Sequence, residues 1–194
     1  VVSPDITDSD LKRLDAAGVR AVRFNFLKRL VDSAPRDIFH NIAKRIANLG
    51  WHVVVYIEAE DLEDLVPFLQ SLPTDIIFDH MARPDVTAGL NSPNFTLFQK
   101  IMENEKFWCK TSCPERLSKE GPEKNYSDIV PFMTLLIKNY SESVLWGTDW
   151  PHPNMKSHMP DDGKLVDILE EIAPTPELQR KLLVDNPMRL YWDN

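Results

Sequence analysis

The sequence predicts an α/β fold with a parallel sheet. The fold is that of a (β/α)8 TIM barrel from which the first two βα units are missing. Short β-branched runs alternate with longer amphipathic segments, which is the pattern of successive βαβ units. The run from Val53 to Val55 is apolar on both faces, as in a parallel strand covered by helices. Polar residues also stand at the C-terminal ends of successive strands, where a barrel builds its active site.

The elements follow one another in a regular order. Strands are expected at residues 1–4, 19–25, 51–57, 75–80, 107–111 and 143–149, the first of them only a strand tail. Helices are expected at residues 5–17, 35–49, 61–72, 95–105, 126–140, 163–172 and 176–191. Thr7 or Ser9 can cap the first helix and Asn94 the fourth, while Gly18 ends the first. Pro131 either kinks its helix or marks the true start.

Two architectures fit this alternation, a doubly wound open sheet and a closed barrel. The chain contains only six glycines, and no glycine-rich phosphate loop follows any strand. This weakens the dinucleotide-binding version of the open sheet. Six expected strands leave a barrel two short. We therefore expect residues 1–194 to form a single partial TIM-barrel domain containing the C-terminal six βα units.

Composition excludes several classes of function. The net charge of −8 argues against a nucleic-acid partner, because phosphate contacts need a basic face. No signal peptide and no apolar run long enough to span a bilayer occur, so no membrane partner and a cytoplasmic location are expected. Cys109 and Cys113 are expected to be buried free thiols, since no second cysteine pair completes a zinc site. The sequence does not decide whether the chain forms a homo-oligomer.

The most specific segment is residues 146–154, which reads Trp-Gly-Thr-Asp-Trp-Pro-His-Pro-Asn. Asp149 follows an apolar strand and lies between tryptophans, whose low dielectric would raise its pKa toward that of a general base. A lone aspartate after a strand more often caps a turn. Because His152 and Asn154 share the same short loop, we expect a site here.

A second candidate segment ends the strand at residues 75–80. His80 faces the mouth of the predicted barrel, where it would act as a ligand, a proton handler or a carbonyl polariser. Asp79 and Arg83 are interpreted as a local ion pair. The other histidines, His40, His52 and His158, are expected to be solvated, and residues 186–191 to start a packing helix.

Three arginines form the third set of candidates: Arg23 at a strand end, Arg29 in the loop beyond it, and Arg116. The planar guanidinium binds a carboxylate through two hydrogen bonds. Arg23 alternates with Val22 and Phe24, so it should face the lumen, where it needs an anionic partner or ligand. Lys110 is expected either in the lumen or paired with Glu58.

Four segments together resemble the amidohydrolase superfamily of metal-dependent-hydrolase barrels: residues 22–26, 79–84, 146–154 and 186–191. Within it, they are most similar to the 2-pyrone-4,6-dicarboxylate lactonase group. The resemblance runs through nearly the whole chain. It implies a lactonase that hydrolyses a small anionic substrate, 2-pyrone-4,6-dicarboxylate, to 4-oxalomesaconate, a step in bacterial catabolism of lignin-derived aromatic compounds.

The same resemblance implies a role for each candidate. Asp149 would deprotonate the attacking water, and His80 would polarise the lactone carbonyl or hold that water. Arg23, Arg29 and Arg116 would grip the two carboxylates, and Tyr56, His152 and Asn154 would complete the pocket. The resemblance implies no required cofactor; a divalent metal, zinc or manganese, would be held by His80 and Asp149.

One departure from the family pattern is the absence of a His-x-His pair. In the family this pair stands at the end of the first barrel strand, and the units that should hold it are absent from this sequence. Without them the barrel has an open edge and the site lacks two groups that polarise the carbonyl. We therefore expect these 194 residues alone to be poorly stable and weakly active. Other reactions on the same scaffold remain open: a sugar-acid lactonase, a sulfonated muconolactone hydrolase or a metal-dependent decarboxylase. A truncated, non-catalytic relative that binds an anion or a partner is a third interpretation.

Overall fold

The computed structural model describes residues 1–27, 35–153 and 155–192, and this part of the chain forms one parallel sheet with helices outside it. Its five strands are β1 (Ala21–Asn25), β2 (His52–Tyr56), β3 (Ile76–Phe78), β4 (Phe107–Ser112) and β5 (Val144–Gly147). They lie side by side in chain order, and every neighbouring pair is parallel. A doubly wound sheet reverses its strand order, so the sheet is of the barrel type.

The expected strand at residues 1–4 is absent from the described residues, so the prediction of six strands is wrong by one. These residues lead into a turn in which the Ile6 amide donates to the Ser3 carbonyl. The first helix, α1 (Asp8–Ala16), follows at once, and the Thr7 side chain caps it by accepting from the Asp10 amide, as predicted.

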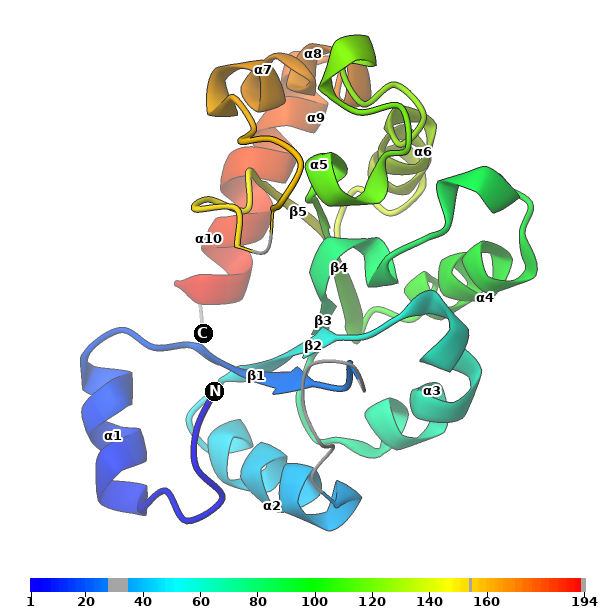
Figure 1. Cartoon of the computed structure of the whole chain (residues 1–194). Helices are drawn as coiled ribbons and strands as arrows, with labels where there is room; N and C mark the ends of the chain where they lie inside the picture. Colours follow the sequence, from blue (N-terminus) through cyan, green and yellow to red (C-terminus); the bar gives the residue numbers. More distant parts are fainter. Residues whose placement is uncertain (28–34, 154, 193–194) are drawn as a thin grey trace.

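The remaining helices surround the sheet, and the last of them packs Leu190 against its inward face. They are α2 (Arg36–Ala47), α3 (Leu62–Ser71), α4 (Pro93–Met102), α5 (Pro114–Leu117), α6 (Val130–Asn139), α7 (Asp162–Asp167), α8 (Leu169–Ile172), α9 (Pro176–Arg180) and α10 (Asn186–Tyr191). Figure 1 shows them as an arc around the sheet that is open between α1 and α10.

The structure decides between the two alternatives for one helix and corrects two other helix predictions. Helix α6 begins at Val130, so Pro131 lies in its first turn and marks the start instead of kinking the helix. Helix α4 begins at Pro93, which puts Ser92 at the N-cap position, and Asn94 lies within the first turn. The two closing helices divide into shorter pieces; α9 and α10 are joined by a π-helical turn at Lys181–Asp185.

The strands present two different apolar faces, because successive side chains alternate. The outward face packs against the helices and contributes to the large core: Val22, Phe24, Val53, Val55, Ile76, Phe78, Phe107, Cys109 and Val144. The inward face forms a smaller cluster of Val54, Ile77, Trp108, Leu145 and, from α10, Leu190. Polar residues two positions after these inward residues therefore also point into the lumen, at the C-terminal ends of the strands.

His52 was predicted to be solvated, and it is instead buried at the start of β2. Its ring lies edge-on to Tyr191, with the centroids 5.1 Å apart. Burial lowers the pKa of His52 to about 4, so it is neutral at pH 7. His52 therefore packs in the lumen of the sheet, on the same face as Val54.

Candidate active site

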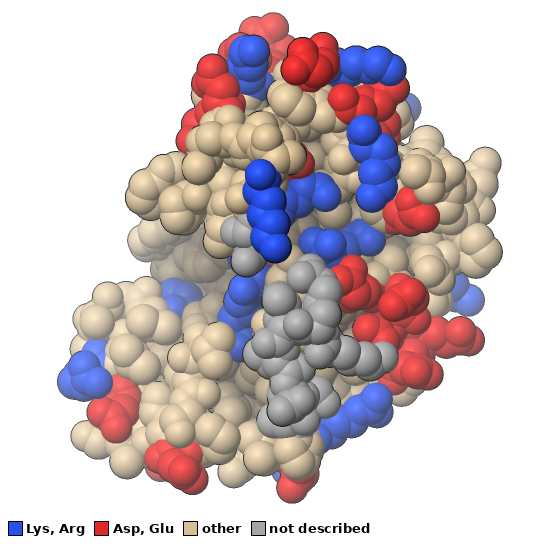
Figure 2. All heavy atoms as spheres, in the orientation of Figure 1, with Lys and Arg blue, Asp and Glu red and all other residues tan. Residues whose placement is uncertain are grey.

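A cavity of about 700 Å³ opens on the inward face of the sheet at the C-terminal ends of the strands. Its polar lining comes from every strand: Arg23, Asn25, Tyr56, Asp79, His80, Lys110, Ser112, Arg116 and Asp149. Figure 2 shows Lys and Arg side chains gathered near the middle of this side of the molecule. The prediction that Arg23 faces the lumen is confirmed, as is the outward packing of Val22 and Phe24, and Asp149 lines the same cavity.

Asp149 stands two residues beyond β5, and its side chain is mostly shielded from solvent. One carboxylate oxygen accepts a hydrogen bond from Arg116, and the other lies 3.6 Å from Nε2 of His80. Burial raises the pKa of Asp149 above its ordinary value, even though Arg116 opposes that shift. A carboxylate with a raised pKa is a better proton acceptor than an exposed one, so Asp149 suits the role of a general base.

His80 is buried and makes contacts through both ring nitrogens. Nδ1 lies 2.8 Å from the hydroxyl of Ser112, and Nε2 lies 3.1 Å from Nη2 of Arg116. A guanidinium can only donate, so Nε2 accepts and Nδ1 carries the proton that is donated to Ser112. Burial lowers the pKa of His80 to about 3, which keeps the ring neutral. Nε2 therefore presents a lone pair to the pocket.

A buried carboxylate, Asp79, organises the opposite side of the pocket. It lies 2.7 Å from Nε of Arg23 and 2.8 Å from Nζ of Lys110. Burial by itself raises the pKa of Asp79, but Lys110 and Arg23 outweigh it, and the pKa lies below its ordinary value. The guanidinium of Arg23 also lies 4.5 Å from the ring centroid of Tyr56.

The predicted ion pair between Asp79 and Arg83 is therefore wrong. Asp79 does not pair with Arg83; it lies on the lumen side with Arg23 and Lys110, because the chain turns sharply after β3. Arg83 instead donates to Glu58 at 2.8 Å and to the Tyr56 hydroxyl at 3.1 Å. Lys110 lies in the lumen, one of its two predicted positions, and its carboxylate partner is not Glu58.

The loops that hold these groups adopt unusual backbone conformations. His80, Cys113 and Asp149, which follow β3, β4 and β5, have φ values of 53°, 67° and 67°. The left-handed region costs a residue other than glycine roughly 1–3 kcal/mol when it is held in a packed structure. The left-handed backbone turns the three side chains toward one point. Strained residues of this kind are typical of functional sites.

The three converging side chains are also the candidate metal ligands. One ligand atom each from His80, Cys113 and Asp149 can be chosen so that all three lie within 4.8 Å of one another. Arg116 already contacts all three: Nη2 contacts His80 and Asp149, and Nε lies 2.7 Å from Sγ of Cys113. Burial raises the pKa of Cys113, which disfavours the thiolate that a metal needs. These residues as arranged do not fit a metal, because a fixed guanidinium occupies their centre.

His152 does not lie where it was predicted. Its side chain is 1% exposed and is not among the described residues that line the cavity. Nδ1 lies 3.4 Å from Glu115 in α5, and Nε2 lies 3.2 Å from Asp162 in α7. The positive φ of His152 turns the ring inward beneath these helices, so it fastens the loop that carries Asp149.

The other candidates divide into three groups. Tyr56 and Arg116 line the cavity, as expected. Arg29 and Asn154 lie outside the described residues. Residues 186–191 form the expected packing helix, α10, but Tyr191 also lines the cavity. Both cysteines are free and buried, as predicted.

Sequence reasoning missed the roles of Asp79 and Ser112 and left that of Lys110 undecided. The signal for all three was present. Trp108, Lys110 and Ser112 alternate along β4, so they share the inward face. Asp79 lies two positions after the inward-facing Ile77, so the same alternation directs it into the lumen.

Within the described residues, no helix combines the length and apolar character needed to cross a membrane. A family model described as "Amidohydrolase" matches residues 1–192. A 2-pyrone-4,6-dicarboxylate hydrolase of Comamonas testosteroni is 59% identical over 98% of this chain and 65% of its own length. A 4-sulfomuconolactone hydrolase of Hydrogenophaga intermedia is 32% identical over 98% of this chain and 63% of its own length. The chain thus spans a little under two thirds of these relatives.

Solved structures show the same fold. A proposed 2-pyrone-4,6-dicarboxylic acid hydrolase from Pseudomonas putida superposes with a TM-score of 0.85 at 30% identity, covering 98% of this chain and 70% of that one. A zinc-bound amidohydrolase from Burkholderia multivorans gives a TM-score of 0.69 at 14% identity over 98% and 71% of the two chains, which shows the fold alone. With the family model covering nearly every residue, this chain belongs to the amidohydrolase family and has its TIM-barrel type of fold.

Proposed function

We propose that this chain carries the active site of a hydrolase that opens the lactone ring of 2-pyrone-4,6-dicarboxylate to give 4-oxalomesaconate. The observation that carries the proposal is the convergence of a carboxylate base and three cations on one cavity. The relative that is 59% identical and named for this hydrolysis supports the choice of substrate.

The charge of the lining favours an anionic ligand. Arg23, Lys110 and Arg116 contribute three positive charges, and Asp79 and Asp149 contribute two negative ones, so these side chains carry a net +1. The chain as a whole carries −8. A positive pocket in an acidic protein attracts a small anion while the remaining surface repels one. A substrate with two carboxylates matches two separated groups of cations.

Binding would fix the ring between these groups. One carboxylate would contact Arg23, whose guanidinium is already oriented by Asp79 and Tyr56. The other would contact Arg116, together with Arg29 and Asn154 if these residues reach the pocket as the sequence predicts. Two fixed anchors hold the lactone carbonyl against the attacking water, which lowers the entropic part of the barrier.

Asp149 would then take a proton from that water as its oxygen attacks the lactone carbonyl carbon. The ring C–O bond breaks, the departing enolate oxygen takes the proton from Asp149, and the resulting enol becomes the ketone of the product. The neutral His80 is suited to hold the water, which is one of its two predicted roles, because its Nε2 can accept from the water in place of Arg116. The positive charge of the Arg116 guanidinium, which contacts Asp149, would stabilise the negative charge that develops on the carbonyl oxygen.

This mechanism requires no metal. Among amidohydrolases of this fold, zinc is present in the Burkholderia multivorans structure. In this chain, Arg116 lies among the three side chains that would hold the ion, and a permanent guanidinium charge can supply part of a metal's electrostatic role.

The test is to incubate the purified protein with 2-pyrone-4,6-dicarboxylate and to follow the loss of pyrone absorbance and the appearance of the product. The same assay with a sulfonated muconolactone and a sugar-acid lactone separates the other lactonase interpretations. Hydrolysis of the dicarboxylate in preference to both supports the proposal. Thermal stabilisation by dicarboxylates without turnover of any lactone would instead indicate a non-catalytic relative.

A further inference from the structure

One wall of the cavity consists of a carboxylate with a cation on each oxygen. Oδ2 of Asp79 lies 2.7 Å from Nε of Arg23, and Oδ1 lies 2.8 Å from Nζ of Lys110. We refer to these three residues as the Asp79 triad. One negative charge is shared by two positive charges, so the triad carries a net +1 when all three are ionised. Only 5% of the Asp79 side chain is exposed, whereas Arg23 and Lys110 retain exposures of 40% and 29%.

The triad is assembled from separate elements. Arg23 comes from β1, Asp79 directly follows β3, and Lys110 comes from β4. Since the strand order is β1-β2-β3-β4-β5, the two cations reach the carboxylate from opposite sides. All three residues line the cavity, and the roles proposed above use Asp79 only to orient Arg23 and give Lys110 no contact with the substrate.

We propose that Lys110 binds one carboxylate of the substrate together with Arg23, and that Asp79 is a positioning residue that holds the two cations side by side. This inference rests on the proposed function, because it assigns a subsite to the dicarboxylate. It makes Lys110 the residue that distinguishes a dicarboxylate from a monocarboxylate.

The donors needed for this subsite are present. The ammonium of Lys110 has three N–H donors, and Asp79 takes one of them. Arg23 uses Nε toward Asp79, and within the described part of the chain its terminal Nη atoms make no other hydrogen bond. A carboxylate that accepts from both side chains would neutralise the net charge of the triad. It would also make charge-assisted hydrogen bonds, which are shorter and stronger than neutral ones.

Asp79 is needed because two cations on one wall repel each other. Its carboxylate fixes the spacing of the ammonium and the guanidinium before the ligand arrives. Preorganised groups lose less conformational entropy on binding than flexible ones do. Replacing Asp79 with Asn keeps the shape but removes the charge that holds the two cations.

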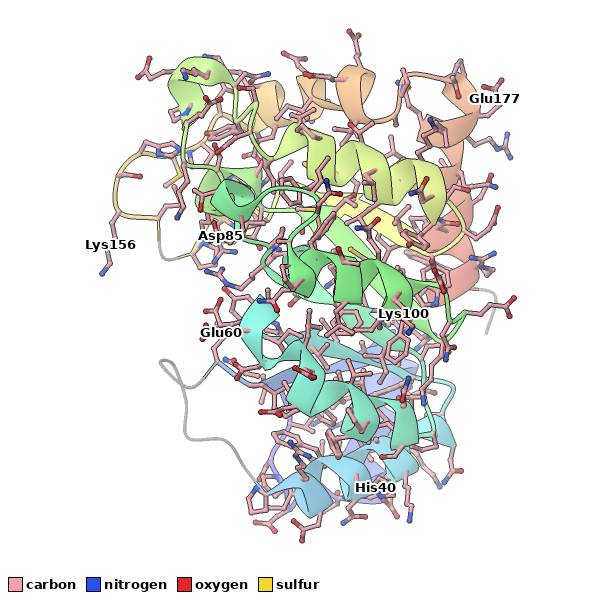
Figure 3. All side chains as sticks on the ribbon, turned by 90° about the vertical axis from the view of Figure 1, so that its right-hand side faces the viewer. His40, Glu60, Asp85, Lys100, Lys156 and Glu177 are labelled. Atoms are coloured by element: carbon pink, nitrogen blue, oxygen red, sulfur yellow. The ribbon has the colours of Figure 1, made fainter. Side chains whose placement is uncertain are left out.

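The experiment measures dissociation constants calorimetrically for benzene-1,3-dicarboxylate and benzoate. The two carboxylates of the first are separated by one ring atom, as in the pyrone. Lys110→Gln is expected to raise the dissociation constant of the dicarboxylate by about 10- to 100-fold, which is the effect of losing one hydrogen bond to a charged group. Benzoate should change little, since it can bind at Arg116. Lys100→Gln is the matched control, because Lys100 is exposed on α4, on the outside of the molecule (Figure 3).

Kinetics with the lactone gives a second measurement. Lys110→Gln should raise KM by a factor similar to the loss in affinity, with a smaller effect on kcat, as expected for uniform binding. In the binding experiment, Asp79→Asn should likewise lose the preference for benzene-1,3-dicarboxylate over benzoate. Thermal unfolding of each variant checks that it folds, and the conservative Lys110→Arg should restore most of the affinity.

Three results would overturn parts of the inference. Dicarboxylate binding by Lys110→Gln equal to that of the wild type would exclude the subsite. Tighter binding by Asp79→Asn would mean that Asp79 only competes with the ligand. A parallel loss of dicarboxylate and benzoate affinity would indicate a general structural effect. If the wild type binds the dicarboxylate through Lys110 but hydrolyses no lactone, the subsite stands and the proposed reaction fails.

Discussion

Replacing Asp149 with Asn tests the proposed base while conserving the shape of the pocket. The amide cannot accept the proton of the attacking water at neutral pH. General-base catalysis contributes about 10²- to 10⁴-fold, so kcat should fall by that factor. At 1.36 kcal/mol for each factor of ten, the barrier would rise by about 2.7 to 5.4 kcal/mol. The loss of pyrone absorbance under saturating substrate measures this directly.

The structure also predicts the effect on stability, which separates catalysis from unfolding. The pKa of Asp149 is raised in the folded protein by burial. A raised pKa means that its stabilising contribution is present below the unfolded pKa and is lost as the pH rises through the folded value. At pH 7 the ionised carboxylate therefore disfavours folding, and Asp149→Asn should not lower Tm.

The matched control is Asp85→Asn, a substitution in an exposed turn whose side chain caps Thr87 (Figure 3). It should leave both kcat and Tm unchanged, because Asn also caps turns of this kind. If Asp149→Asn retains more than about a tenth of the activity, a factor well below the general-base range, Asp149 is not the base. A large fall in Tm would show that its ion pair with Arg116 is mainly structural.

Three further predictions follow from the same geometry. Treatment with a chelator should leave activity unchanged, because Arg116 contacts the three side chains that would hold a metal; loss of activity that zinc or manganese restores would contradict this. The value of kcat/KM should decrease as the pH falls through the pKa of Asp149, with a midpoint above the ordinary value of 3.8, and a flat profile down to that pH would refute a titrating base. His152→Ala should lower the free energy of unfolding by about 1–3 kcal/mol, because the buried Glu115 loses a hydrogen-bond partner, and should barely change KM; a higher KM with an unchanged Tm would return His152 to the substrate pocket.

The strand pattern of the sequence predicted most of the fold for a physical reason. Buried parallel strands must be apolar on the face toward the helices, so Val53 to Val55 and the alternation around Arg23 indicated both the sheet and its lumen. The same alternation placed Arg23 in the lumen, whereas Asp149 was identified from the loop that it shares with His152 and Asn154. The residues at 1–4 misled the prediction, because two valines suggest a strand whether or not a neighbouring strand is available to pair with them.

Two of the errors within the site have a common cause. The positions of Arg83 and His152 depend on left-handed turns after strands, where period-two alternation no longer applies. The positive φ at His152 turns that ring inward to Glu115, away from the substrate. The four consecutive residues from His80 to Arg83 with positive φ separate Arg83 from Asp79, which a sequence reader pairs by proximity. Sequence alone predicted which loops carry the chemistry but not the partner of each side chain.

The central claim is that a dicarboxylate lactone lies between the cations and the carboxylate base of one cavity. A crystal structure of the Asp149→Asn variant with 2-pyrone-4,6-dicarboxylate bound tests it most directly. We predict one carboxylate at Arg23 and the other at Arg116, with the lactone carbonyl carbon facing residue 149 and His80. A ligand bound outside this cavity, or with its lactone carbonyl turned away from residue 149, would contradict the account.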